Sequence, residues 1–168
     1  MSMKVCVYET ARDVARAAAM VFASEVMKRE GAVIGLATGS TPVPCYGELI
    51  KLCAEGLIDF SKVVSFNLDE YIGLAPDHPC SYRRFMNEQL FDHIDIQKAN
   101  THVPDGVNPD PEGYDRAIAA AGGIDLQLLG IGSNGHIGFN EPNDRFVYPT
   151  NIIPLTEKGV AKGNKLFG

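Results

Sequence analysis

The chain of 168 residues is long enough for one domain that buries most of its apolar surface, and 45% of its residues are hydrophobic. Its 21 acidic residues outnumber the 15 lysines and arginines, and the formal net charge of -6 argues against a broad basic surface for nucleic acid. The N-terminus lacks the apolar core of a signal peptide, and no apolar run reaches the roughly 18 residues that a membrane helix needs. The four cysteines show no C-x-x-C spacing and are interpreted as reduced thiols. We therefore expect a globular cytoplasmic protein that binds neither nucleic acid nor membrane.

Short β-rich runs alternate with helical patterns along the chain, which is typical of βαβ units around a parallel sheet. The first helical pattern begins with Thr10 and Asp13, two residue types that cap helix N-termini. The expected strands are residues 3–8, 32–37, 63–66 and 124–132, and the expected helices are residues 10–30, 43–55, 81–91 and 111–121. The pattern predicts an α/β fold, a Rossmann-like open parallel sheet with helices on both faces.

The alternation weakens after Pro142, where two further prolines interrupt the chain and no closing strand is evident. Four strands are fewer than open doubly wound sheets usually have. We therefore expect a single domain over residues 1–168 that is short at its C-terminal side, incomplete after about residue 145.

Three polar or glycine-rich loops follow predicted strands, namely "ATGSTP", "NLDEY" and "GIGSNGHIGFNEP". Because helical crossovers are right-handed, parallel strands deliver their C-terminal ends to one edge of the sheet, where ligands of such sheets bind. We therefore expect the three loops to meet at one site.

The first loop, Thr38-Gly39-Ser40-Thr41, lies between a predicted strand and a predicted helix. Its backbone N–H groups and hydroxyls can converge on an anion at the helix N-terminus. It is not a Walker A loop, because no G-K-[ST] follows. An ordinary strand-to-helix turn with a Ser or Thr cap is the alternative interpretation.

The third loop contains "GIGSNG", residues 130–135, which matches the G-x-G-x-x-G pattern of dinucleotide-binding folds. That fingerprint has to open a helix, whereas "HIGFNEPN" continues with glycine, asparagine and proline in a non-helical order. A dinucleotide site is therefore not expected.

His136 is flanked by glycines in the third loop, with Asn134 two residues before it and Glu141 five residues after it. Glycines let the backbone approach a ligand closely, and the two polar neighbours could fix the imidazole tautomer and raise its basicity. The arrangement predicts a general acid or base. The remaining histidines are interpreted as structural: His78, His93 and His102.

Asp69 and Glu70 end a predicted buried strand, and no Lys or Arg lies within five residues of them. Adjacent acids are most often a solvated pair on a loop. Two like charges beside low-dielectric walls raise one carboxyl pKa, however, and such a carboxyl near an anionic sugar suits a general base. Metal binding is the weaker interpretation, because these acids and His136 lack a compact H-x-x-x-H or D-x-D spacing.

Taken together, "LATGSTP", "FNLDEYIGL" and "GIGSNGHIGFNEP" resemble the glucosamine-6-phosphate deaminase family, within the wider group of sugar-phosphate isomerases and lactonases. The resemblance runs in order from Met3 to Pro142, and "FNLDEY" joined to "GHIGFNEP" is its most specific part. It implies an aldose–ketose isomerisation with deamination, from glucosamine 6-phosphate and water to fructose 6-phosphate and ammonia, with no cofactor and no metal.

The same resemblance implies roles for single residues. Asp69 would move a proton between C2 and C1 of the sugar, and His136 would assist opening of the pyranose ring. Glu141 and Asn134 would orient His136.

The substrate implied is an amino-sugar phosphate, with Glu70 and Gly135 among the residues that contact it. A homo-oligomer is a further possibility that the sequence leaves open. The residues that would bind the 6-phosphate are Thr38, Gly39, Ser40, Thr41 and Lys165.

The chain departs from the family pattern in three places. Many members have Asp where Asn134 stands; the amide can still hydrogen-bond His136 but cannot share its charge, and we expect this to be tolerated. Family chains continue beyond this length, and Lys165 is the nearest counterpart of a phosphate-binding arginine, without arginine's bidentate fork. Asn151 stands where regulated members carry an arginine, so activation by N-acetylglucosamine 6-phosphate is not expected.

Two alternatives stay open at the level of sequence. A lactonase of the same group would hydrolyse 6-phosphogluconolactone, although the acids of "FNLDEY" favour proton transfer at carbon. A non-catalytic chain would bind sugar phosphate only, or would associate with full-length subunits through an exposed sheet edge.

Overall fold

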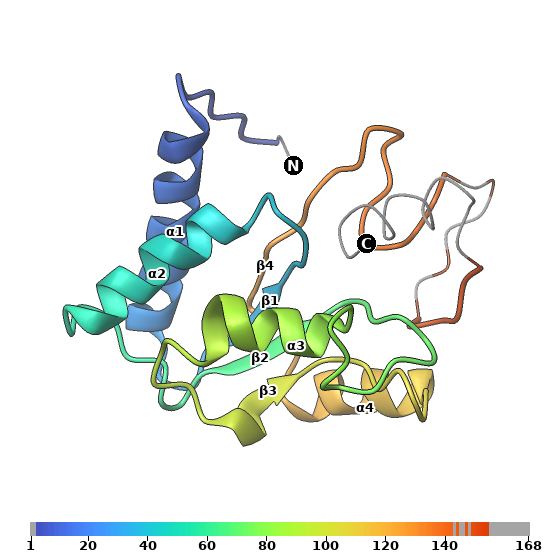
Figure 1. The fold of residues 1–168 in the computed structure, drawn as a ribbon. Helices are drawn as coiled ribbons and strands as arrows, with labels where there is room; N and C mark the ends of the chain where they lie inside the picture. Colours follow the sequence, from blue (N-terminus) through green and yellow to red (C-terminus); the bar gives the residue numbers. More distant parts are fainter. Residues whose placement is uncertain (1–2, 143, 145–146, 148, 155–168) are drawn as a thin grey trace.

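The computed structural model describes residues 3–142, 144, 147 and 149–154. In this part of the chain, a four-stranded sheet forms the centre of the fold, in the order β3-β2-β1-β4 with all neighbouring strands parallel (Figure 1). The strands are β1 (Val33–Leu36), β2 (Val64–Asn67), β3 (Thr101–His102) and β4 (Leu126–Gln127). The predicted α/β class with an open parallel sheet is confirmed.

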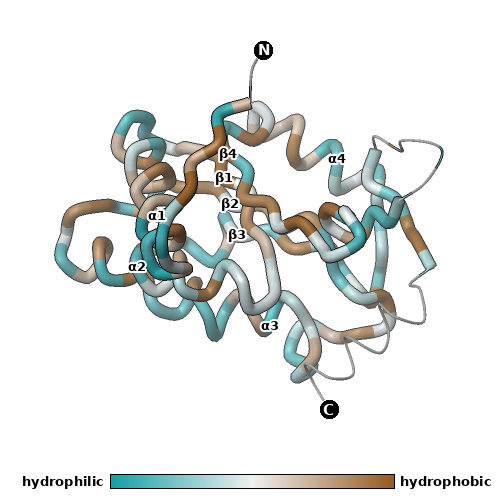
Figure 2. The backbone as a smooth tube through the Cα atoms, turned by 90° about the horizontal axis from the view of Figure 1, so that it is seen from above, coloured by the Kyte–Doolittle hydropathy of each residue, from teal (hydrophilic) through white to brown (hydrophobic). Residues whose placement is uncertain are grey.

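Helices cover both faces of the sheet, as predicted. Ile34 and Leu36 of β1 pack into a hydrophobic cluster with three helical segments, whereas Phe66 of β2 contacts Tyr114 of a fourth helix on the opposite face, with ring centroids 5.8 Å apart. Figure 2 shows the strands between these two groups of helices. The helices are α1 (Ala11–Lys28), α2 (Val43–Ala54) and α3 (Tyr82–Met86), followed by a π-helical turn (Asn87–Phe91), and α4 (Pro111–Ala120) on the other face.

Local sequence explains how the helices begin. The Thr10 side chain accepts a hydrogen bond from the Asp13 N–H at 3.2 Å and thus caps α1 as predicted. Pro44 lies at the second position of α2 and Pro111 at the first position of α4, within the first turn, where the missing N–H costs nothing. Within the described residues, no helix combines the length and apolar character needed to cross a membrane.

The prediction of a strand at Met3–Tyr8 is wrong. These residues form no strand (Figure 1). The side chains of Met3, Val5 and Val7 are exposed. A strand is stable only where a neighbour takes up its N–H and C=O groups, and this segment pairs with none of the described strands.

One further strand was missed, and two predicted elements differ in extent. β3 was not predicted, because two residues are too short to show an alternating pattern. The strand expected at residues 124–132 forms only at Leu126–Gln127, and the helix expected at residues 81–91 changes to a π-helical turn after Met86.

The strand order marks one place on the sheet edge as the usual ligand site. β1, β2 and β3 follow one another in one direction across the sheet, whereas β4 lies on the opposite side of β1. In open α/β sheets, ligands bind at the C-terminal ends of the strands where the winding reverses in this way. That crevice lies between the ends of β1 and β4, whose following loops leave on the same side of the sheet (Figure 1).

Candidate active site

The loop after β1 presents free backbone donors at the start of α2. Its base is fixed by the Tyr46 hydroxyl, which accepts from the Ala37 N–H at 3.1 Å and donates to the Ala37 carbonyl. Gly39 has φ +88°, in the left-handed region that favours glycine. In the described structure the N–H groups of Gly39, Ser40 and Thr41 donate to no protein acceptor, so they are available to an anion.

Asp69 connects the loop after β1 to the loop after β2. It follows β2, is half-buried, and accepts a long hydrogen bond of 3.4 Å from the Thr38 hydroxyl. Burial raises the pKa of Asp69 to about 6; the Thr38 hydrogen bond opposes this rise, and the negative charge of Glu70 adds to it. A carboxyl with a raised pKa was expected at this position, and the first two predicted loops meet through their side chains.

Unlike Asp69, Glu70 uses its carboxylate in hydrogen bonds to the start of α3. Its carboxylate accepts hydrogen bonds from the N–H groups of Tyr71 (2.8 Å), Tyr82 (3.0 Å) and Arg83 (3.0 Å) and from the Ser81 hydroxyl (2.8 Å). A carboxylate at a helix N-terminus satisfies donors that the helix itself leaves unpaired. Glu70 therefore joins α3 to the loop that carries Asp69, and its predicted contact with the substrate stays a prediction.

Replacing Glu70 by alanine is expected to lower the free energy of unfolding by about 2–3 kcal/mol, because several donors lose a charged acceptor. The urea midpoint of the variant measures this loss. Glu88→Ala is the matched control, since the Glu88 carboxylate pairs on the surface with Arg84 at 2.7 Å and should contribute less than about 0.5 kcal/mol. Equal losses in the two variants would contradict the capping role.

The loop after β4 folds back on itself around His136. The Gly132 N–H donates to the His136 carbonyl at 2.8 Å, and the Gly135 N–H, in a residue with φ +88°, donates to the Gly132 carbonyl at 2.9 Å. The imidazole lies over Gly132, where a Cβ would overlap the ring. Gly132 therefore makes room for the histidine ring itself.

Asn134 connects His136 to Glu141. The Asn134 Oδ1 atom lies 2.6 Å from the His136 Nδ1 atom, and the Asn134 amide nitrogen donates to the Glu141 carboxylate. A carboxylate only accepts, so the amide nitrogen must face Glu141 and the amide oxygen must face His136. The Nδ1 atom then carries a proton, which leaves Nε2 as the acceptor of neutral imidazole. Glu141 thus orients His136 through Asn134, and the predicted trio is brought together.

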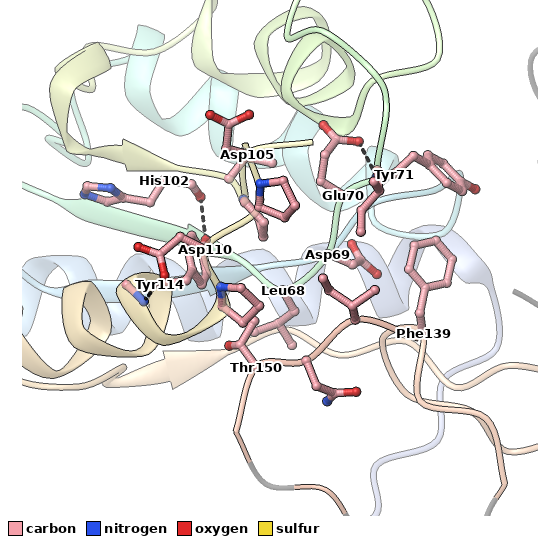
Figure 3. A pocket seen from close by; sticks show the side chains of 18 of the residues that line it. Leu68, Asp69, Glu70, Tyr71, His102, Asp105, Asp110, Tyr114, Phe139 and Thr150 are labelled. Carbon is pink, nitrogen blue, oxygen red and sulfur yellow. Dashed lines mark hydrogen bonds between the residues drawn. The ribbon is translucent and has the colours of Figure 1, made fainter. Parts of the chain in front are cut away.

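A pocket of about 940 Å³ opens beside Asp69. The ends of β2 and β3, α4 and residues 139–140, 147 and 149–153 surround it, and its labelled lining includes His102, Tyr114, Phe139 and Thr150 (Figure 3). Among the described residues, neither the loop 38–41 nor His136 lines this pocket. Asp69 lines the pocket, and its carboxylate also accepts the hydrogen bond from the Thr38 hydroxyl.

Two contacts near the site were not predicted from sequence. Phe139 packs against Tyr71, with ring centroids 5.3 Å apart, and Thr150 donates through its N–H to the Asp115 carboxylate of α4 at 3.1 Å. An aromatic residue inside a glycine-rich loop was the available signal for the first contact. Lys165, predicted to bind phosphate, lies outside the described residues.

The fold and the site define an α/β protein whose candidate site lies at the C-terminal ends of three adjoining strands. The loop after β1 has free backbone donors, Asp69 follows β2, and the hydrogen-bonded residues His136, Asn134 and Glu141 follow β4. The family described as glucosamine-6-phosphate isomerases/6-phosphogluconolactonase matches residues 7–139. The chain belongs to this family, as its sequence motifs indicated.

Individual relatives agree with this assignment. A glucosamine-6-phosphate deaminase of Shewanella woodyi is 51% identical over 98% of this chain, which corresponds to 64% of that protein. The solved structure of a monomeric glucosamine-6-phosphate deaminase superposes with a TM-score of 0.94 at 38% identity, covering 98% of this chain and 70% of that one. A 6-phosphogluconolactonase from Thermotoga maritima is more distant, with a TM-score of 0.67, 27% identity, and coverage of 82% of this chain and 63% of that one. The chain thus spans about two thirds of the length of the deaminases it matches.

Proposed function

We propose that the protein is a glucosamine-6-phosphate deaminase, which converts glucosamine 6-phosphate and water to fructose 6-phosphate and ammonia. The observation that carries the proposal is the placement of Asp69 after β2 and of the His136–Asn134–Glu141 relay after β4, at the same edge of the sheet on either side of the loop after β1. Two of the relatives described above are named for this activity.

The substrate phosphate is proposed to bind at the loop after β1. Its backbone N–H groups at residues 39–41 meet no acceptor in the described part of the chain, and the positive end of the α2 dipole adds to their attraction for an anion. The residues proposed for this contact are Thr38, Gly39, Ser40 and Thr41. Lys165 stays a sequence-based prediction.

His136 is proposed to open the pyranose ring. Opening requires that the proton of the C1 hydroxyl is removed and that the ring oxygen receives a proton. With Nδ1 bonded to the Asn134 oxygen, Nε2 is the atom that can accept a proton from one oxygen and deliver it to the other.

Asp69 is proposed to move the proton at carbon. In the open-chain sugar, its carboxylate takes the C2 proton and returns it to C1. One proton passes from the amine nitrogen to O1, so the aldehyde carbon becomes a hydroxymethyl group and the C2 amine becomes an imine. Water then adds to the imine, and ammonia leaves as the C2 ketone forms. A carboxyl with a pKa of about 6 is largely ionised at neutral pH and is more basic than an ordinary aspartate.

We also propose that the reaction takes place in the cytoplasm. All four cysteines, Cys6, Cys45, Cys53 and Cys80, are free thiols, which suits a reducing compartment. The predicted small-molecule partner is an amino-sugar phosphate.

Ammonia release from glucosamine 6-phosphate by the purified 168-residue chain tests the proposal, with 6-phosphogluconolactone as the competing substrate. We expect ammonia release and no faster hydrolysis of the lactone than in buffer. Lactone hydrolysis without ammonia would assign the site to the other branch of the family. A folded chain inactive on both compounds would show that it is not an enzyme by itself.

A further inference from the structure

Three aromatic rings connect the loop after β2, the start of α3 and the loop after β4. The ring centroids lie 4.9 Å apart for Tyr71 and Tyr82, 5.3 Å for Tyr71 and Phe139, and 5.9 Å for Tyr82 and Phe139. The Tyr82 hydroxyl donates to the Tyr71 hydroxyl at 3.2 Å. Aromatic pairs at such separations stabilise contacts beyond the area they bury. We call these three residues the aromatic bridge.

The aromatic bridge is attached to both halves of the site. Tyr71 lies two residues after Asp69, and Phe139 lies between His136 and Glu141. The backbone N–H groups of Tyr71 and Tyr82 both donate to the Glu70 carboxylate, so two of the rings share one rigid support. Phe139 brings the loop after β4 to that support.

The Phe139 ring also lines the pocket that the proposed base faces. Asp69 and Phe139 both belong to the pocket lining, and Figure 3 shows the Phe139 ring on the same side of the pocket as the Asp69 carboxylate. An apolar ring offers no hydrogen bond, so it weakens the solvation of an ionised carboxylate beside it.

We propose that Phe139 is a positioning residue: packed against Tyr71 and Tyr82, its ring places the His136 loop relative to Asp69 and shields the Asp69 carboxylate from water. The inference rests on the proposed function, because it concerns the same site. Phe139 acts through these two groups and transfers no proton itself.

The Asp69 titration is a suitable readout because few other groups interfere with it. Among the residues that the structure describes, the ionisable groups that face Asp69 are Glu70 on its own loop, Tyr46 of α2, Tyr82 of α3 and Tyr114 of α4. Burial raises the pKa of the three tyrosines, so they stay neutral where Asp69 titrates. Glu70 is present in every variant used, and a changed midpoint therefore reports the loss of the ring.

The experiment compares Phe139→Leu with the wild-type chain, the conservative variant Phe139→Tyr and the control Phe85→Leu. Phe85 lies on α3 one turn from Tyr82, but its ring packs against the hydrophobic core. The carboxyl carbon of Asp69, assigned by its loss in Asp69→Asn, is titrated by NMR, and kcat and KM are measured on glucosamine 6-phosphate. Circular dichroism checks folding, and Phe139→Met replaces Phe139→Leu if the latter does not fold.

In Phe139→Leu we expect the Asp69 midpoint to fall by about half a unit to one unit, and kcat to fall about tenfold or more with a smaller change in KM. Phe139→Tyr should stay within about threefold of the wild-type kcat, and Phe85→Leu should leave the midpoint unchanged. An unchanged midpoint in Phe139→Leu, an equal shift in Phe85→Leu, or a kcat within about twofold of wild type overturns the inference. If the wild-type chain releases no ammonia, the proposed function fails, while the titration still decides whether Phe139 shields Asp69.

Discussion

Asp69→Asn is expected to abolish exchange of the substrate's C2 proton with solvent, and ammonia release with it, while sugar-phosphate binding stays within a few-fold. The amide cannot accept a proton from carbon, yet it preserves the shape of the side chain and can still interact with the Thr38 hydroxyl. Deuterium incorporation at C2 measures the exchange, and displacement of a fluorescent sugar phosphate measures binding. Retained exchange would remove Asp69 from the role of base.

The pH dependence of the wild-type chain belongs to the same prediction. The base must be ionised to accept a proton, so kcat/KM should rise with pH and level off above the Asp69 pKa of about 6. A profile whose acid limb lies near the ordinary aspartate pKa of about 3.9 would show that Asp69 is not the group that controls the rate.

Asp69→Asn is expected to abolish activity but to increase the stability of the fold. Because the folded pKa of Asp69 is raised, protonated Asp69 stabilises the fold fully below its unfolded pKa, and this stabilisation is lost as the pH rises through about 6. Asparagine does not ionise, so Asp69→Asn should gain up to about 3 kcal/mol relative to wild type between pH 4 and pH 7.5. Urea unfolding at the two pH values measures the difference. A difference that does not change with pH would contradict burial of the ionised group.

Local patterns were sufficient to predict the elements that place the site. β1 and β2 are apolar runs followed by turn residues, and Thr10 marks the start of α1. Met3–Tyr8 has an equally good strand pattern, but a pattern does not specify the neighbour that a strand requires. The wrong strand and the missed strand β3 therefore have one cause, since pairing is a property of the assembled sheet.

The candidate site was predicted only in part for a similar reason. Asp69 and Glu70 look equivalent in sequence, and they differ because α3 begins where its free N–H groups meet the second carboxylate only. The aromatic bridge could not be predicted, because Tyr82 and Phe139 are distant in sequence and meet only when two loops approach each other. Residues close in sequence, such as Asn134 and His136, were the ones whose contact could be anticipated.

His136→Gln is expected to reduce kcat/KM on glucosamine 6-phosphate by about 10²–10³, because ring opening loses its acid and base. The 5-deoxy analogue of the substrate has no hydroxyl with which to close a pyranose ring, so its turnover should fall by less than about tenfold. Initial rates on both compounds provide the comparison. His93→Gln makes the same change at a histidine whose Nε2 lies 2.8 Å from the Glu88 carbonyl, away from the relay, and should leave both rates unchanged.

Glu141→Gln tests whether the relay fixes the tautomer of His136. The carboxylate holds the Asn134 amide in one orientation because it can only accept, whereas a glutamine amide can donate as well and permits Asn134 to flip. A flipped Asn134 would direct its N–H₂ group at Nδ1, which would then have to lose its proton and leave Nε2 protonated. We expect turnover of the cyclic substrate to fall about 10–100-fold, with a smaller effect on the 5-deoxy analogue. Equal losses on both substrates for His136→Gln and Glu141→Gln would assign the relay to a step after ring opening.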